Sequence, residues 1–466
     1  MNVPTGASQS ARGPRSYADS MRTAPEATAQ HREPARPHGP RLLAGWYESG
    51  RPAGLREHLD RYGSAPITGL TTDHRRSRLI HAVEQSGLTG RGGAAFPTAR
   101  KLRAVSDGRG GAVVVANGME SEPASSKDRT LLALAPHLVL DGIVLAALAV
   151  GADQAHLCLP RTRPHLVDAL REAAEERWNR RVDPIAIDVH GLPHHYVSSE
   201  ETSLIGWLNG ESAKPASVPP RPFERGVGKR PTLVDNVETL AHLALIARYG
   251  PAWFRSQGAP DAPGTTLVTL SGALADPGVF EVDLGTPLRD VIALGTLTQP
   301  AQAVLLGGFF GSWLTAEEAW ALGYSAPGIN AAGGGIGAGV IAVLPQGACG
   351  LVETARVLEY LAAQSAGQCG PCRFGLPAVA RDLADLAHSR IDQDQARRLQ
   401  ERIGLLAGRG ACKHPDGASR LAASALRVFA QDAQYHLHHG PCPAARSHAP
   451  VLPVPRPATI GEGDWR

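Results

Sequence analysis

The sequence predicts a multidomain protein of the α/β class, and three patterns carry this prediction. Between residues 41 and 255, β-branched runs such as GAVVVA at 111–116 alternate with helical patterns such as 166–178, which is typical of a mostly parallel sheet with helices. Between 256 and 345, strand-like runs (LVTLSGAL, GVFEV, AVLLGGF) surround the short helical run LRDVIALG, which indicates a compact α+β module. From 346 to 440, apolar residues recur every three to four positions with short connections, as in a helical bundle.

The two ends of the chain differ from these domains in composition. Residues 1–40 are rich in Ala, Arg, Pro and Ser without apolar periodicity, which predicts a disordered tail. The Pro-rich residues 441–466 are expected to be a flexible tail, and both tails to be removable without loss of the fold. Inside the domains, the apolar pattern predicts continuous helices over 131–150 and 418–437.

Charge, apolar runs and cysteine content exclude several classes of protein. The chain of 466 residues carries 47 Lys and Arg against 44 Asp and Glu, a net charge of +3, which does not favour nucleic-acid binding. Its longest apolar stretch, 142–152, is far shorter than the ~20 residues that cross a bilayer, and the polar N-terminus does not have the pattern of a secretory signal. Six cysteines are too few for a disulfide scaffold. A cytoplasmic, reducing location is expected, with a peripheral place on a membrane complex as its variant.

A glycine-rich loop, GLTGRGGAAFPTARKL at 87–102, is the first candidate site. Gly90, Gly92 and Gly93 free backbone N–H groups to converge on an anion, while Arg91 and Lys101 add positive charge. A phosphate-bearing ligand and a simple packing turn both fit this pattern, and the Walker motif GxxxxGK[ST] is absent.

Polar residues follow the strand predicted at 111–116. In open α/β sheets, ligands bind at the carboxyl ends of strands, and the run NGMESEP stands at this point. A later run, YVSSEETSL, has two adjacent carboxylates, which are also common at a solvated helix start. The candidates from the two runs are Asn117, Glu120, Ser121, Glu122, Tyr196, Glu200 and Glu201.

Several spaced motifs together resemble one known family. GRGGAAFPT is followed by NGMESEP, KDR, EET and PTLVDNVETL in the same order along the chain. This combination closely resembles the NADH-binding FMN flavoprotein subunit of respiratory complex I and its relatives in soluble hydrogenases and formate dehydrogenases. The resemblance covers about residues 86–429. It implies a Rossmann-like domain that binds FMN and NADH or NADPH, then a ubiquitin-like β-grasp module of the SLBB type, then an all-α bundle with one [4Fe–4S] cluster.

The resemblance also implies roles for individual residues. Phe96 and Glu122 fall on positions of the family that line the nicotinamide-nucleotide cleft. Cys369, Cys372 and Cys412 fall on cluster ligands. The positions that correspond to the family's FMN site are Gly90, Arg91, Gly92, Lys101, Asn117, Glu120, Ser121, Tyr196, Glu200, Glu201 and Asn236.

Five positions depart from the family pattern around these nucleotides. Met119 replaces an Asp that faces the flavin, Ser199 replaces a Gly, and Asp235 replaces the first Asn of a pair. Such exchanges alter the charge and hydrogen bonding around a flavin and hence its potential. Ala104 and Arg221 stand where the family places Phe. Arg221 could stack on adenine or pair with a 2′-phosphate, but we favour its interpretation as a surface residue in a reshaped loop.

The cysteine pattern CxxC, followed after 39 residues by a third Cys, is a chelate typical of iron–sulfur or zinc sites. The family has one more ligand, and Ala366 stands in its place. A cluster on three thiolates with an open iron, a fourth ligand from Ser365, His414, Asp416 or Cys349, a zinc ion and an empty site all remain open, with a bound metal favoured.

Two other runs contain similar signals. Cys158, in the strand-like AHLCL, is expected to be a buried small hydrophobe. Cys442 follows His436, His438 and His439 in what resembles a metal-binding tract, although we favour a frayed helix end. The glycines of AAGGGIGAG at 331–339 precede a strand-like run rather than a helix, so we interpret them as a packing turn and not as a dinucleotide fingerprint.

The function expected from this resemblance is electron input. Hydride passes from NAD(P)H to FMN, with Glu120 and Glu201 shaping the site, and single electrons pass on to an iron–sulfur cluster and a partner such as a ferredoxin-like protein. No side chain acts as nucleophile or base, because the cofactor performs the chemistry. The alternative is a degenerate, non-catalytic assembly or regulatory subunit, which would explain why Ala366, Ala104, Arg221 and Met119 all depart from the family.

Overall fold

A parallel four-stranded sheet forms the centre of the N-terminal half of the chain. The computed structural model describes residues 40–466 except 69, 71–72 and 448, so the predicted tail at 1–40 lies, apart from its last residue, outside the described residues. The strand order is β3 (Ile187–Leu192), β2 (Ala152–Pro160), β1 (Ala112–Asn117) and β4 (Thr232–Asn236), and all neighbours run parallel. The predicted parallel sheet is therefore confirmed.

Strand β1 is buried on both faces of this sheet. Ala112, Val114 and Ala116 face one apolar core, whereas Val113 and Val115 face a second one, because successive side chains point to opposite faces. A strand covered on both faces reads as a continuous apolar run. This explains why the β-branched sequence at this position identified the strand.

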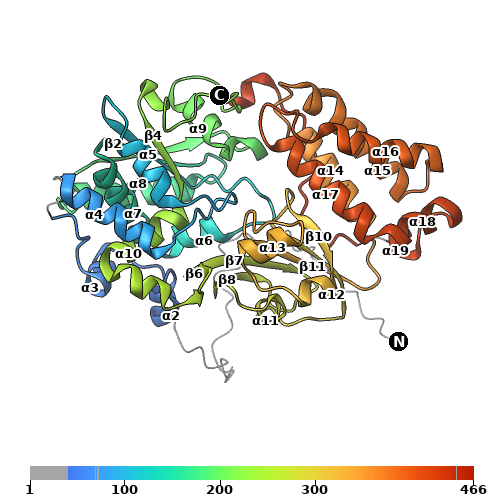
Figure 1. Cartoon of the computed structure of the whole chain (residues 1–466), viewed down its shortest axis with the longest axis horizontal. Helices are drawn as coiled ribbons and strands as arrows, with labels where there is room; N and C mark the ends of the chain where they lie inside the picture. The colour runs from blue at the N-terminus through green and yellow to red at the C-terminus, as the bar shows by residue number, and fades with distance from the viewer. Residues whose placement is uncertain (1–39, 69, 71–72, 448) are drawn as a thin grey trace, which may run out of the picture. The chain divides into compact units, whose positions relative to one another are not determined.

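Helices cover both faces of the sheet (Figure 1). The first core contains residues from α4 (Asp73–Ser86), α5 (Thr98–Ser106), α7 (Pro136–Val150), α8 (Pro164–Asn179) and α10 (Val237–Arg255). The second core is closed by α9 (Glu201–Leu208) and the short turn η2 (Val227–Lys229), and the turn η1 (Tyr196–Ser199) precedes α9. Two further helices, α2 (Ala44–Ser49) and α3 (Leu55–Tyr62), precede α4.

The helix expected over 131–150 is two helices, so that prediction was wrong. α6 (Lys127–Leu134) and α7 meet at Ala135 with a bend of 98°. Pro136 is the first residue of α7, and a proline ring there cannot donate the hydrogen bond that would continue α6.

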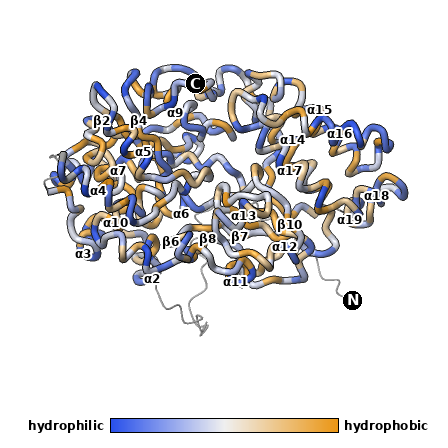
Figure 2. The backbone as a smooth tube through the Cα atoms, viewed as in Figure 1, coloured by the Kyte–Doolittle hydropathy of each residue, from blue (hydrophilic) through white to orange (hydrophobic). Residues whose placement is uncertain are grey.

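Helix α7 is the apolar centre of this half and is almost wholly buried; Figure 2 draws it mainly in the hydrophobic colour. It packs closely on α10, since a Cβ on Gly142 would lie 2.1 Å from the Leu240 carbonyl oxygen. Among the described residues, no single helix is long and apolar enough to cross a membrane; only the bent pair α6 and α7 meets the test of length and composition.

A mixed five-stranded sheet follows. Its order is β10 (Ser312–Thr315), β9 (Ala301–Leu306), β11 (Val340–Pro345), β7 (Thr265–Gly272) and β8 (Gly278–Asp283), in which only β11 and β7 pair in parallel. The predicted strand-like runs and the short helix, α11 (Leu288–Ala293), are all present. Minor elements of this part are β5 (Gly258–Ala259), β6 (Ala262–Pro263), α12 (Ala316–Trp320) and α13 (Ala326–Ala331).

The last part is helical, as predicted, and lies at the right of Figure 1. It comprises α14 (Gly350–Ala363), the short π-helix η3 (Pro371–Gly375), α15 (Leu376–Ala387), α16 (Gln393–Leu406), α17 (His414–Val428) and α18 (Ala430–His439). The single helix expected over 418–437 was wrong: it breaks at Phe429, whose buried ring packs edge-on against Trp313. Because that ring must enter the core, the chain leaves helical geometry there.

In place of a flexible tail, parts of the described C-terminal segment contact the rest of the chain. After α19 (Pro443–Arg446), the N–H groups of Val451 and Leu452 donate to the buried Glu353 carboxylate at 2.8 and 3.1 Å. In the final turn η4 (Glu462–Trp465), the Trp465 side chain is buried. Its ring centroid lies 4.3 Å from that of His195, and the two rings are tilted by 43°. The Pro-rich composition suggested a loose tail because isolated apolar residues carry no periodic signal.

Candidate functional site

A cavity of about 710 Å³ opens where the parallel sheet, the mixed sheet and the helical part meet. It is lined by the glycine-rich loop, the ends of β1 and β4 with the residues after β1, the run 196–200, residues 307 and 310, the segment 330–338 before β11, and residues 412–420 at the start of α17. It lies at the carboxyl ends of the parallel strands, where ligands bind in open α/β sheets.

Backbone hydrogen bonds close the glycine-rich loop on itself. The Gly90 N–H donates to the Phe96 carbonyl at 2.8 Å. Gly93 has φ +111°, and a Cβ there would lie 3.3 Å from the Gly337 carbonyl oxygen of the segment before β11. A side chain at position 93 would therefore be strained and crowded, so glycine lets the two loops meet at the cavity.

A strained residue follows strand β1. Glu120 has φ +36°, a conformation uncommon for a residue with a side chain. Its carboxylate accepts hydrogen bonds from the Asp128 N–H at 2.8 Å, from the Arg129 N–H at 3.2 Å and from the Ser125 hydroxyl at 3.0 Å. The negative charge thus lies at the N-terminus of α6, where the helix dipole stabilises it.

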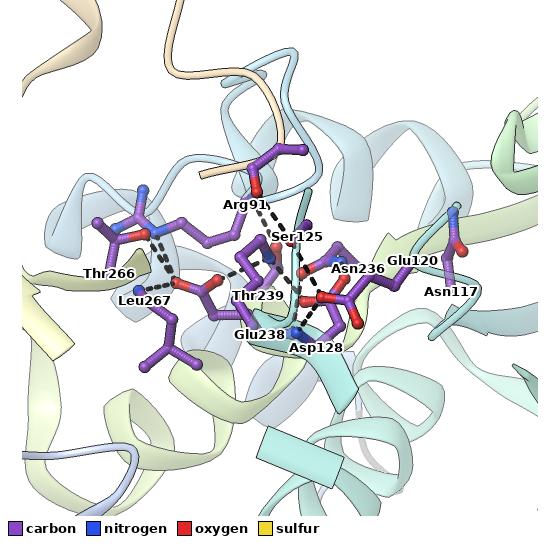
Figure 3. A network of polar contacts seen from close by, with 12 residues as sticks. Arg91, Asn117, Glu120, Ser125, Asp128, Asn236, Glu238, Thr239, Thr266 and Leu267 are labelled. Atoms are coloured by element: carbon purple, nitrogen blue, oxygen red, sulfur yellow. Dashed lines mark hydrogen bonds and ion pairs between the residues drawn. The ribbon is translucent and has the colours of Figure 1, made fainter. Parts of the chain in front are cut away.

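A buried ionic network lies behind the cavity wall (Figure 3). The Lys127 ammonium is 2.6 Å from Asp128 and 2.8 Å from Glu238. Glu238 also accepts from the Thr266 hydroxyl at 2.8 Å and the Leu267 N–H at 3.0 Å on β7. Burial alone would lower the pKa of Lys127, but the two carboxylates reverse this effect and raise it.

Arg91 belongs to the same network. Its backbone N–H donates to the Thr239 hydroxyl at 2.8 Å, and its guanidinium donates to the Thr89 hydroxyl and the Thr265 carbonyl. The guanidinium also lies 3.9 Å from Glu238. Arg91 borders the cavity, yet its charge is used to join the glycine-rich loop to β7.

Glu122 is a buried carboxyl group at the opposite wall. It accepts from the Tyr196 hydroxyl at 2.7 Å and from the N–H groups of Phe309 at 2.8 Å and Ala124 at 3.1 Å. Burial raises the pKa of Glu122 to about 7, although these three hydrogen bonds favour the charged form. Because the group is so placed, it titrates near neutral pH.

The run YVSSEETSL forms the third wall. Glu200 is the N-cap of α9 and accepts from the Thr202 N–H at 2.9 Å, so the helix-start interpretation of the paired carboxylates is confirmed. Glu200 nevertheless borders the cavity, and burial raises its pKa. Ser199 is hydrogen-bonded to Ser121, and its carbonyl accepts from the Asn117 amide at 2.8 Å.

The structure brings together most of the residues expected to bind cofactors. Gly90 borders a smaller neighbouring cavity of about 290 Å³ instead. Lys101, Glu201 and the exposed Phe96 border neither cavity, and their roles stay predictions. The expected residues that border the main cavity are Arg91, Gly92, Asn117, Glu120, Ser121, Glu122, Tyr196, Glu200, Asn236 and Cys412.

Residues that depart from the family pattern have clear places. Met119 is fully buried in the second core beside Cys158, away from the cavity lining. Asp235 is buried 3.7 Å from the Lys101 ammonium, which donates to the Val234 carbonyl at 2.7 Å; burial raises the pKa of Asp235, and Lys101 opposes this shift. Arg221 is exposed, as the surface interpretation predicts.

Three thiols gather beside the cavity. Cys369, Cys372 and Cys412 interact electrostatically with one another. Cys372 lies in the short π-helix η3, and π-helical segments are rare and often found at functional sites. Cys412 borders the main cavity, and burial raises the pKa of this thiol. The cysteine site and the cavity therefore share a wall.

Of the fourth ligands left open by the sequence, two have other partners. Asp416 accepts from the Gly408 N–H at 2.8 Å and from Lys413 at 3.0 Å. Cys349 lies in a separate group with His436 and Cys442. The His414 ring is buried with Nε2 2.8 Å from the Leu361 carbonyl, and burial lowers its pKa to about 4. Its Nδ1 atom has no hydrogen-bond partner.

Sequence reasoning missed part of the cavity lining. The glycines at 333–337 were interpreted as a packing turn. They do pack, since a Cβ on Gly337 would lie 2.2 Å from the Gly307 carbonyl oxygen, but they also line the cavity. No local pattern marks them as a cofactor loop, because their place depends on the meeting of two sheets. The other missed residues are Ser125, Lys127, Asp128, Phe310, Asn330, Lys413 and Arg420.

Fold, cavity and thiols together define a flavin- and iron–sulfur-binding oxidoreductase component, and comparisons with known proteins agree. Residues 83–245 match the family model of the Nuo51 FMN-binding domain, and residues 353–436 match that of the NADH-ubiquinone oxidoreductase-F iron-sulfur binding region. The chain is 31% identical to the F subunit of NADH-quinone oxidoreductase of Streptomyces coelicolor over 379 residues, 78% of this chain and 84% of that protein. The chain therefore belongs to the family of NADH-quinone oxidoreductase F subunits.

Two further relatives extend this result. The F subunit of NADH-quinone oxidoreductase of Aquifex aeolicus is 33% identical over 310 residues, 64% of this chain and 71% of that protein. Among solved structures, the NAD⁺-reducing [NiFe]-hydrogenase in the H₂-reduced state matches with a TM-score of 0.77 and 28% identity, over 86% of this chain and 67% of the other.

The residues of the cavity fit a flavin nucleotide. Its volume lies within the ~300–1,000 Å³ usual for ligand sites, and glycines from two loops leave its walls open where side chains would fill it. A Cβ on Gly92, for instance, would contact the Asn236 Cβ atom at 3.4 Å, and both residues line the cavity. The amide, hydroxyl and carboxylate groups of β1, β4 and η1 supply polar contacts.

We predict that Glu122→Gln flattens the pH dependence of stability. A folded-state pKa of about 7 against an ordinary value of 4.5 means that the native state holds an extra proton between these values, so Glu122 costs stability as pH rises from about 4.5 to 7. The loss is on the order of 3 kcal/mol above pH 7. Thermal unfolding from pH 5 to 8 should show a smaller decline for the variant, whereas the exposed Glu172→Gln control should follow the wild type. Superimposable profiles of variant and wild type would contradict the assignment.

Proposed function

We propose that this chain oxidises NAD(P)H at the main cavity and passes the electrons to an iron–sulfur centre and then to a partner protein. As a member of the F-subunit family, it is an FMN-dependent electron-input module. The observation that carries the proposal is the shared wall: Cys412 borders the same cavity as the glycine-rich loop and the end of β1. A flavin in this cavity would thus be adjacent to the thiol site.

FMN, when bound here, supplies hydride acceptance from NAD(P)H and one-electron release. Backbone N–H groups of the glycine-rich loop would hold its phosphate, and Asn117, Ser121, Asn236 and Glu200 would bind its polar groups. Glu120 keeps a fixed negative charge at the pocket wall, because the N-terminus of α6 holds it there. Lys101 keeps Asp235 in place and is proposed to act through that carboxylate.

The nicotinamide nucleotide is proposed to approach from the side of Phe96 and Glu122. Phe96 is 47% exposed, so its ring is free to stack on a base. Exposed Arg221 gives no support for recognition of a 2′-phosphate. NADH is the substrate that the F-subunit relatives are named for, and we propose it for this chain.

Three modules are proposed for these steps, with the boundaries expected from the sequence: 41–255 for FMN and nucleotide, 256–345 as a β-grasp module of the SLBB type, and 346–440 for the iron–sulfur centre. The strand order of the mixed sheet supports the β-grasp proposal. An acceptor such as a ferredoxin-like subunit is proposed as the partner, since the relatives are named as parts of larger enzymes.

The thiol site supports a cluster with an incomplete ligand set. Cys369, Cys372 and Cys412 would hold it, whereas a complete [4Fe–4S] cluster takes four thiolates and Ala366 offers none. This observation also favours a second function, a non-catalytic assembly subunit. The cavity argues against that alternative, because its polar wall residues are retained.

Purification under anaerobic conditions tests the function directly. We expect the wild type to show a flavin absorption band that is bleached by NADH. In Gly92→Val, the added side chain at the cavity lining should lower flavin content at least about tenfold, without loss of the fold. Gly404→Val is the control, since a Cβ there has no neighbour within 4 Å. Protein without flavin, or flavin that NADH does not bleach, would support the non-catalytic alternative.

Restoring the missing ligand tests the cluster. In Ala366→Cys, iron and sulfide per chain should rise to about four each, and the iron signal should survive exposure to air longer, because four thiolates leave no open iron. Ser365→Cys, one residue away, is the matched control and should bring a smaller gain. Absence of iron in both the wild type and Ala366→Cys would contradict any cluster at this site.

A further inference from the structure

Two cysteines and a histidine that the proposed function does not use lie together in the helical part. The Sγ atoms of Cys349 and Cys442 and a ring nitrogen of His436 all lie within 4.8 Å of one another. The Cys349 Sγ atom is 3.9 Å from His436 Nε2. Cys349 and His436 are each 1% exposed. Residues from both ends of the helical part therefore form one small buried cluster.

Each of the three residues is positioned by a helix end or a turn. Cys349 is the N-cap of α14. His436 lies in α18, and Gly440, with φ +85°, reverses the chain after it. Cys442 then returns to the same place, so that its backbone N–H donates to His436 Nε2 at 3.1 Å. The turn thus brings Cys442 back against the helix that it has just left.

The cluster is distinct from the iron–sulfur thiols. Cys369, Cys372 and Cys412 interact with one another, whereas Cys349 interacts with Cys442. Cys349 and Cys442 also fall outside residues 353–436, which match the iron–sulfur model. Cys349 is therefore not the fourth ligand of that centre, an option that the sequence left open.

The chemistry of the three groups suits a soft divalent cation. Zinc is bound by thiolates at ~2.3 Å and by imidazole nitrogen at ~2.0–2.1 Å in tetrahedral geometry, which places a sulfur and a nitrogen about 3.6 Å apart. The observed 3.9 Å needs only a small contraction. Two thiolates would also neutralise the charge of the ion, which matters in a site packed against the apolar core of the helical part.

The surroundings of the imidazole support the same conclusion. Nε2 accepts the Cys442 N–H, so zinc would take over the lone pair that now accepts this hydrogen bond, while the buried Nδ1 atom has no hydrogen-bond partner. Asp432, one helical turn earlier on α18, interacts electrostatically with this ring. Metal-binding histidines commonly have a carboxylate near their second nitrogen.

We infer that Cys349, His436 and Cys442 bind one Zn²⁺ ion, separate from the iron–sulfur centre, with the fourth position open to water on the side of the partly exposed Cys442. The ion links the start of α14 to the end of α18 and the start of α19. The ion thus holds the C-terminal segment on the helical part.

Metal analysis of the anaerobically purified full chain tests this inference. We expect about one zinc per chain in the wild type and a loss of at least roughly tenfold in Cys442→Ala and in His436→Gln, with iron and flavin content unchanged. His438→Gln is the matched control, because this exposed histidine of the same helix lies outside the cluster. Added Co²⁺ should give a stronger thiolate-to-cobalt absorption band in metal-depleted wild type than in metal-depleted Cys442→Ala, in which only the separate thiol site of Cys369, Cys372 and Cys412 remains.

Three results would overturn the inference: no zinc in the wild type, zinc retained in both variants, or a Cys349–Cys442 disulfide in protein kept from air. Alkylation of denatured, unreduced protein detects the disulfide as two unmodified cysteines. Should the variants fail to fold, the Co²⁺ spectrum of the wild type still decides, because a spectrum without a thiolate band contradicts the site.

Discussion

The carboxylate of Glu238 is the interaction on which the rest of the site depends. It is fully buried at the start of α10 and binds Lys127 of α6 and the N–H and hydroxyl groups of β7. One side chain therefore joins a helix of the parallel sheet to the first strand of the mixed sheet. The glycine-rich loop meets the same point through Arg91. The main cavity forms between the parallel sheet and the mixed sheet, and the contacts of Glu238 hold these two sheets in place.

A buried ionic group of this kind carries a cost. Removing charges from water costs several kcal/mol per ion, and only close pairing and hydrogen bonds offset it. Here Lys127 has two carboxylate partners, and Glu238 has hydrogen bonds to both of its oxygen atoms. A buried ionic network of this kind therefore adds little net stability. It does fix the position of the two sheets relative to each other, and this position determines the shape of the main cavity.

Sequence patterns predicted the elements and most of the cavity residues, and their failures have physical causes. The parallel strands were predictable because burial on both faces leaves a continuous apolar run. The glycines at 333–337 and the partner of Arg91 were not, since their roles depend on contact between two sheets. Periodicity also missed Pro136 and Phe429 as helix breaks, because apolar spacing continues across them. The tract from His436 to Cys442 resembled a metal-binding run, but Cys349 lies 87 residues before His436 and no spacing connected it to that tract.

The departures from the family pattern affect the site to different degrees. Met119 enters a core instead of the cavity, and Asp235 lies near Lys101, which opposes the cost of its burial. These exchanges leave the pocket intact. Ala366 is different, since it offers no thiolate, and two of the candidate replacements, Asp416 and Cys349, have other partners. The case for a non-catalytic function therefore rests on the iron–sulfur centre and not on the flavin pocket.

A double-mutant cycle between Lys127 and Glu238 tests the central claim most directly. Lys127→Met and Glu238→Gln should each lower the free energy of unfolding by about 3 kcal/mol and reduce flavin content, and the double variant should recover about 2 kcal/mol relative to additivity. The exposed pair Arg397 and Asp394 is the control, with a coupling below about 1 kcal/mol. Additive effects of Lys127 and Glu238, with flavin content unchanged, would contradict the claim that this pair holds the two sheets together around the site.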